Sequence, residues 1–119
     1  MPYLELIDAF SVQDLLTNVN LIKTNIYGIN INLLHIESRF SPTSCDPSIL
    51  RNSELFDVNV KKSLVDVKKI VNGIDVTWSQ DPDIPLVLKG IKEINEEIGN
   101  IIPRHNIILG YCRSSAFGV

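Results

Sequence analysis

Residues 84–101 constrain the fold most, because their apolar side chains recur with the period of an α-helix. Apolar residues three or four positions apart lie on one face of a helix. In this region they are Val87, Ile91, Ile94, Ile98 and Ile101. Asp83 is a suitable N-cap, and Pro85 falls in the first turn, where its missing N–H costs nothing. Pro103 predicts the end of the helix.

The same spacing predicts two more helices. A short one over residues 12–22 follows Ser11, which resembles the first residue of a capping box. Another is predicted from about residue 60 to residue 72, where Asn72 and Gly73 supply a C-terminal stop. Between these helices, residues 38–54 collect Ser, Pro, Thr and Asp around Cys45, and predict a long irregular loop.

Four segments are typical of β-strands. The clearest lies within residues 26–37, where Ile29, Ile31 and Leu33 alternate with asparagines. The other three are residues 3–8, 74–79 and 106–112.

Strands that alternate with helices favour a single α/β domain over residues 1–119, with a four-stranded, mostly parallel sheet flanked by three helices. The alternative is an α+β sandwich, ferredoxin-like or tautomerase-like, in which residues 55–60 add a strand. The side chains expected in the core are Val67, Trp78, Ile91, Ile98 and Leu109.

Composition excludes several classes of protein. The chain has 119 residues, 45% of them hydrophobic, and a formal net charge of −3. This composition excludes intrinsic disorder, and it gives no basic field that would attract nucleic acid or an anionic membrane. The N-terminus lacks the basic region of a signal peptide, and two cysteines are too few for a secreted disulfide scaffold. We therefore expect a cytoplasmic protein with free thiols, in which Cys112 is buried and Cys45 reacts first.

Polar residues follow the predicted strands, and in a parallel sheet the carboxyl ends of the strands form the usual binding crevice. Acids, hydroxyls and arginines at these ends predict a site for a polar or anionic small ligand. The ligand-binding candidates are Asp8, Arg39, Asp81, Arg113 and Ser114. No phosphate-binding glycine loop and no metal-ligand spacing occurs, so neither a cofactor nor a metal is predicted.

Two histidines could transfer protons near neutral pH. His35 would share a strand face with Glu37, which could orient and charge its imidazole as an acid–base group requires. The alternative is a structural hydrogen bond at a sheet edge. His105 is predicted to lie on the surface, in a turn between helix and strand.

Pro2 would begin the first strand once Met1 is removed, and in this it resembles the tautomerase family. The resemblance covers Pro2, the approximate length, and the β-α-β order of the second half. It implies that the N-terminal proline is a catalytic base, which takes a proton from the carbon next to a carbonyl. The long 38–54 loop departs from the family's pattern.

Two functions follow. The first is a binding or assembly module that forms a homo-oligomer, since the chain carries more apolar residues than so small a domain can bury. Its apolar tail, residues 116–119, would dock on a neighbouring subunit. The alternative is a cofactor-independent isomerase that acts on a small oxyacid, with Pro2 or His35 as the base and an arginine holding the carboxylate.

Overall fold

The computed structural model describes residues 2–41 and 45–116, with side chains described up to Arg113. Three long helices account for most of this part of the chain: α1 (Val12–Arg39), α2 (Pro47–Asn72) and α3 (Ile84–Ala116). A short 3-10 helix, η1 (Val76–Trp78), lies between α2 and α3. The described residues form no β-strand, so the predicted α/β fold is wrong, and so are its α+β alternatives.

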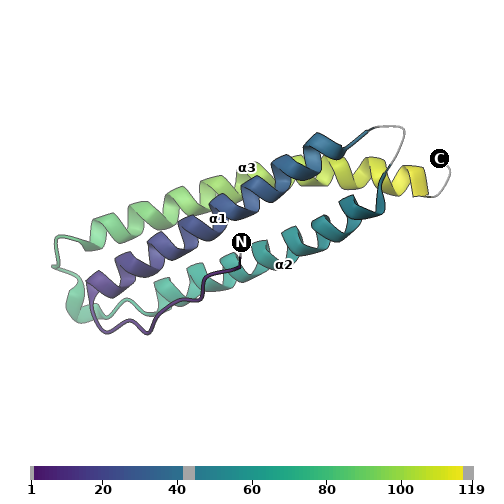
Figure 1. Ribbon diagram of the computed structural model, residues 1–119. Helices are drawn as coiled ribbons and strands as arrows, with labels where there is room; N and C mark the ends of the chain where they lie inside the picture. The colour runs from purple at the N-terminus through teal and green to yellow at the C-terminus, as the bar shows by residue number, and fades with distance from the viewer. Residues whose placement is uncertain (1, 42–44, 117–119) are drawn as a thin grey trace.

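The helices run up, down and up along an elongated bundle of 58 × 22 × 19 Å (Figure 1). α1 packs closely along both α2 and α3, whereas α2 and α3 approach each other less closely. The extended residues 2–10 precede α1 and turn back along it, between α1 and α2 (Figure 1). We call residues 2–10 the strap.

Each helix buries a seam of side chains spaced alternately three and four residues apart. In α1 the seam is Val12, Leu15, Val19, Ile22, Ile26, Ile29, Leu33 and Ile36. In α2 it is Ile49, Ser53, Phe56, Val60, Ser63, Val67 and Ile70. In α3 it is Ile84, Val87, Ile91, Ile94, Ile98, Ile101, His105, Ile108 and Cys112. This seven-residue repeat is the pattern of helices that pack with nearly aligned axes.

The seam explains why residues 26–37 are helical. Ile29 and Leu33 are buried, whereas Ile31, which alternation would place beside them, is 48% exposed. The intervening asparagines make polar contacts with α3 and α2: Asn30 accepts from Arg104, and Asn32 donates to the carbonyl of Asn52. Burial of a continuous helical seam therefore overrides the strand preference of β-branched residues.

The other two strands predicted after residue 70 are also corrected. Residues 74–79 form the turn that contains η1, in which Val76 is 85% exposed and Asp75 caps the 3-10 helix. Residues 106–112 continue α3, because the seam extends through Ile108 to Cys112. Of the expected core residues, Val67, Ile91 and Ile98 are buried as predicted. Trp78 and Leu109 are half-buried.

Pro103 does not end α3. A proline inside a helix leaves the carbonyl four residues earlier without its usual partner, which here is Gly99. Both residues lie on the exposed face of α3, where water can satisfy that carbonyl. The predicted helices at 12–22, 60–72 and 84–101 are confirmed as parts of α1, α2 and α3, which are longer than the sequence suggested.

Cys45 and Cys112 form a disulfide, so the prediction of two free thiols is wrong. Their Cα atoms are 5.2 Å apart, although 67 positions separate them in the sequence. The bond ties the start of α2 to the end of α3, where the long helices bring both cysteines to the same end of the bundle. Cys112 is buried, as predicted.

In the described part of the chain, no helix has the length and apolar content needed to cross a membrane.

Gly90 marks a close approach of α3 to α1. A Cβ atom built on it would lie 2.5 Å from Cγ1 of Val19, which is shorter than any van der Waals contact. Valine has essentially one side-chain rotamer in a helix, so Val19 cannot move aside freely. By contrast, nothing lies within 4 Å of a Cβ at Gly110.

We therefore predict opposite effects for the same substitution at these two glycines. Gly90→Ala should lower the free energy of unfolding by about 1–2 kcal/mol, because overpacking exceeds the gain in helix propensity. Gly110→Ala should raise it by about 0.5–1 kcal/mol through helix propensity alone. Urea denaturation of both variants checks this, and a stabilising Gly90→Ala would contradict the helix contact.

His105 belongs to the core seam and is only 1% exposed, which corrects its predicted surface position. Its ring packs on Phe56 with centroids 4.2 Å apart, and Nδ1 lies 3.7 Å from Oδ1 of Asp57. Nε2 has no hydrogen-bond partner among the described residues. Burial lowers the pKa of His105 below its ordinary value, and the Asp57 carboxylate opposes this only in part.

We predict that His105 makes stability depend on pH below about 6.5, the pKa of an unperturbed histidine. As the pH falls through this value, the unfolded chain takes up a proton that the folded chain does not. The free energy of unfolding should then fall by up to about 1.4 kcal/mol per pH unit. His105→Leu should remove this slope between pH 6.5 and 5.5 in urea denaturation, whereas His35→Gln, at an exposed position, should keep it.

Candidate binding groove

Two buried asparagines of α1 hold the main chain of the strap. Asn25 accepts the N–H of Leu4 at 2.7 Å and donates to the carbonyl of the same residue at 2.8 Å. Asn18 binds Ile7 in the same way, at 2.8 and 2.9 Å. A carboxamide offers one acceptor and two donors, so one asparagine side chain can bind both the N–H and the C=O of a single strap residue. These contacts recognise backbone and are indifferent to the side chain that the strap carries.

The spacing of the two pairs follows from chain geometry. Asn18 and Asn25 are seven residues apart on a helix, which is about 10.5 Å. Leu4 and Ile7 are three residues apart on an extended chain, which is about 10 Å. The strap therefore runs antiparallel to α1 with one asparagine for every three residues. We call this repeat the asparagine ladder.

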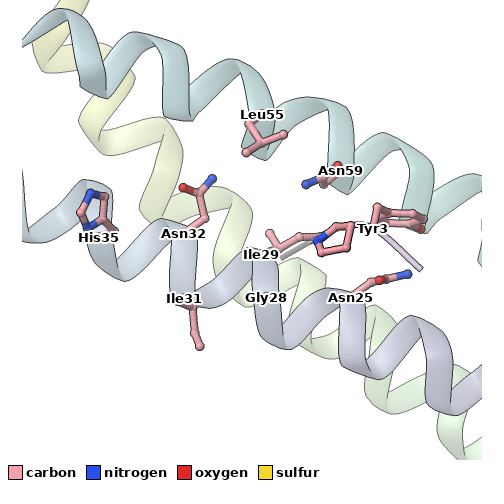
Figure 2. A pocket seen from close by; sticks show the side chains of 10 residues that line it. Tyr3, Asn25, Gly28, Ile29, Ile31, Asn32, His35, Leu55 and Asn59 are labelled. Atoms are coloured by element: carbon pink, nitrogen blue, oxygen red, sulfur yellow. The ribbon is translucent and has the colours of Figure 1, made fainter. Parts of the chain in front are cut away.

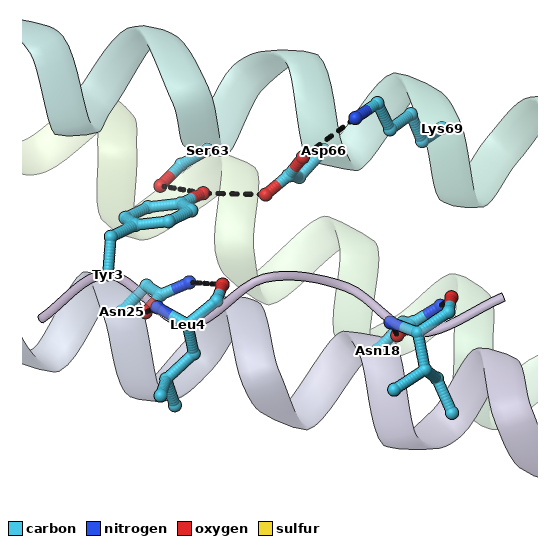
Figure 3. A network of polar contacts seen from close by, with 8 residues as sticks. Tyr3, Leu4, Asn18, Asn25, Ser63, Asp66 and Lys69 are labelled. Atoms are coloured by element: carbon cyan, nitrogen blue, oxygen red, sulfur yellow. Dashed lines mark hydrogen bonds and ion pairs between the residues drawn. The ribbon is translucent and has the colours of Figure 1, made fainter.

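Tyr3 fastens the strap to α2. Its hydroxyl donates to Oδ2 of Asp66 at 2.7 Å and lies 3.4 Å from Oγ of Ser63 (Figure 3). Lys69 lies 3.8 Å from the other carboxylate oxygen of Asp66, and Nζ of Lys62 is 5.3 Å from the centre of the Tyr3 ring. Burial raises the pKa of Tyr3 well above its ordinary value, and the Asp66 carboxylate adds to this. The phenol therefore remains a donor, and the buried Asp66 stays hydrogen-bonded.

A cavity of about 320 Å³ continues the groove beyond the point where the strap begins (Figure 2). α1 lines it with Asn25, Gly28, Ile29, Ile31, Asn32 and His35, α2 lines it with Leu55 and Asn59, and the strap closes one end with Pro2 and Tyr3. His35 and Tyr3 are the only lining residues with titratable side chains, and the lining contains no Asp, Glu, Lys or Arg. The cavity is therefore suited to an uncharged occupant.

Asn32 occupies the next position of the asparagine ladder, seven residues after Asn25, and it faces this cavity. One of its amide hydrogens is donated to the carbonyl of Asn52 at 3.1 Å. Asn59 presents a second carboxamide from the α2 side (Figure 2). Gly28, one turn from both Asn25 and Asn32, contributes no side chain to the floor of the groove.

The structure brings together only two of the predicted catalytic residues. Pro2 and His35 line the same cavity. Glu37 is two residues beyond His35 on a helix, so it points to a different side of α1. There its carboxylate pairs with the guanidinium of Arg104, which also raises the pKa of that arginine.

The predicted ligand-binding residues lie at opposite ends of the bundle. Asp8 and Asp81 lie near the start of α1 and of α3, whereas Arg39 ends α1, and Arg113 and Ser114 belong to the last turn of α3. The crevice at strand ends has no counterpart, because the described residues form no sheet. Nor do they contain any group of three or more His, Cys, Asp or Glu residues that could hold a metal ion.

Sequence reasoning missed the ladder, although its signal is visible. Asn18, Asn25 and Asn32 recur at intervals of seven, the same interval as the core seam beside them. Asparagine is a poor helix former, and such a repeat on one flank of a helix indicates that the flank makes specific hydrogen bonds.

No match was found when the chain was compared with protein-family models, with curated proteins or with solved structures.

We predict that the ladder protects single strap amides from hydrogen exchange. The N–H groups of Leu4 and Ile7 should exchange slowly. In Asn25→Asp the carboxylate cannot donate to the Leu4 carbonyl, and we expect about 1–3 kcal/mol less protection for Leu4. Amide exchange followed by NMR measures this. The matched control is Asn20→Asp, which makes the same change at an exposed position of α1, and equal loss in both variants would contradict the ladder.

Proposed function

We propose that this protein is a binding module whose α1–α2 groove holds an extended polypeptide segment by its main chain. The asparagine ladder carries this proposal. Two of its positions already hold extended backbone, that of the strap, and the third, Asn32, opens onto an adjoining cavity. A groove that recognises backbone through evenly spaced carboxamides is a helical analogue of the edge of a sheet, which also binds extended peptides through their main chain.

The chemistry of the lining defines the ligand. An incoming peptide would offer its N–H and C=O groups to Asn32 and rest its side chains against Leu55, which is about half exposed. An uncharged stretch of mainly aliphatic residues fits these surroundings. The isomerase alternative receives less support, because no arginine or lysine lines the cavity to hold an oxyacid.

The compartment is a separate part of this proposal. The expectation of a cytoplasmic protein rested on an N-terminus without the basic region of a signal peptide and on the small number of cysteines. The free thiols that it implied are contradicted by the Cys45–Cys112 disulfide. Disulfides persist mainly in oxidising surroundings. We therefore place the binding function in an oxidising compartment.

We predict that the full chain binds the capped peptide acetyl-Tyr-Leu-Gln-Leu-Ile-amide, which repeats the strap sequence with its acid replaced. In an NMR titration the side-chain amide signals of Asn32 and Asn59 should shift in a saturable way. Asn32→Asp keeps the shape of the side chain but loses the donor, so it should weaken binding about tenfold or more.

Asn20→Asp is the matched control and should bind like the unchanged chain. Because Asn32 also contacts Asn52, a second variant avoids any effect on folding: Leu55→Glu alters an exposed wall of the groove, with Leu86→Glu as its control on α3. Failure to saturate at millimolar peptide would overturn the proposal. Equal affinity of Asn32→Asp and Asn20→Asp would overturn it as well.

A further inference from the structure

A second stripe runs along α2, one residue out of phase with its core seam. Its members are all exposed and keep the alternating spacing of four and three residues from residue 50 to residue 71. Leu50, Leu64 and Val71 are its apolar members, with 46%, 39% and 48% of their surface exposed. These three apolar side chains lie on a face of α2 that the rest of the bundle leaves uncovered.

The charged members of the stripe are ordered along α2. Glu54 and Asp57 lie in its first half, whereas Lys61 and Lys68 lie in its second half. Within the described residues, Glu54, Lys61 and Lys68 make no ion pair, and Asp57 has only the 3.7 Å contact with His105. These charges are therefore free to meet a partner.

This order makes the stripe complementary to itself when reversed. If two copies of α2 are aligned antiparallel about a two-fold axis near residue 61, Leu50 of one copy faces Val71 of the other. Glu54 then faces Lys68, and Asp57 lies beside Lys61. An isologous contact repeats the Glu54–Lys68 pair twice, whereas the two Lys61 side chains lie near the axis, each within reach of Asp57 of the other copy. A parallel alignment would instead place like charges together.

We propose that a second copy of this chain docks on the exposed α2 stripe, with the two α2 helices antiparallel. The contact spans residues 50–71, which is about 32 Å of helix. The contact of Asp57 with His105 shows that the stripe lies on the flank of α2 towards α3. None of the stripe residues lines the cavity at Asn32. The dimer therefore stands independently of the proposed peptide binding.

Charge exchange tests this pairing in the full chain. Sedimentation velocity between 10 and 500 µM should show a reversible monomer–dimer equilibrium. Glu54→Lys and Lys68→Glu should each weaken it about tenfold or more, because two attractive pairs per dimer become repulsive. The double variant should restore self-association, and an equimolar mixture of the two single variants should form a heterodimer.

Glu96→Lys on the exposed face of α3 is the matched control and should leave the equilibrium unchanged. Circular dichroism should show unaltered helix in every variant, since none of these side chains is buried. A strict monomer at 500 µM would refute the proposal. Single variants that dimerise like the unchanged chain, or a double variant and a mixture that stay monomeric, would refute it too.

Discussion

Burial of one heptad seam from each helix is the interaction on which the rest of this structure depends. The seam of α1 runs unbroken from Val12 to Ile36, and both other helices pack along it. Because the repeat is seven residues on all three helices, each helix keeps the same side towards the core along its whole length. The residues that flank the seam therefore also fall into straight rows along each helix. Polar side chains in these rows can make specific contacts with a neighbouring helix or with the strap.

The two flanks of α1 show how such rows work. One flank carries Lys23 and Glu37, which pair with Glu93 and Arg104 of α3 and fix the longitudinal position of that helix. The other flank carries the asparagine ladder, which fixes the strap at three-residue intervals. Exposed ion pairs contribute little stability. Repeating apolar seams would allow the helices to pack in more than one longitudinal register. The placement of the ion pairs disfavours the alternative registers, because there the charges would lose their partners.

The sequence allowed part of each of the three long helices to be predicted, but not their full length. The window from Val87 to Ile101 is long enough for the helical period to be unambiguous. The strand predicted around Ile31 rested on five residues, over which alternate asparagines imitate a period of two. A helix and a strand can be told apart here only by following the spacing of the apolar residues from Val12 onward, which is that of a helix. Pro103 and the two cysteines were misjudged for another reason: their outcome depends on which faces the finished bundle exposes to solvent and which ends it brings together.

The disulfide has a mechanical consequence. It encloses α2, η1 and nearly all of α3 in one covalent loop, whereas the strap and α1 lie outside it. Tension applied to the chain on either side of this loop would travel through the sulfur atoms and bypass everything between Cys45 and Cys112. The strap and α1 would detach and extend, while a hidden length of about 230 Å, the 67 intervening steps at full extension, would stay coiled until the bond was reduced.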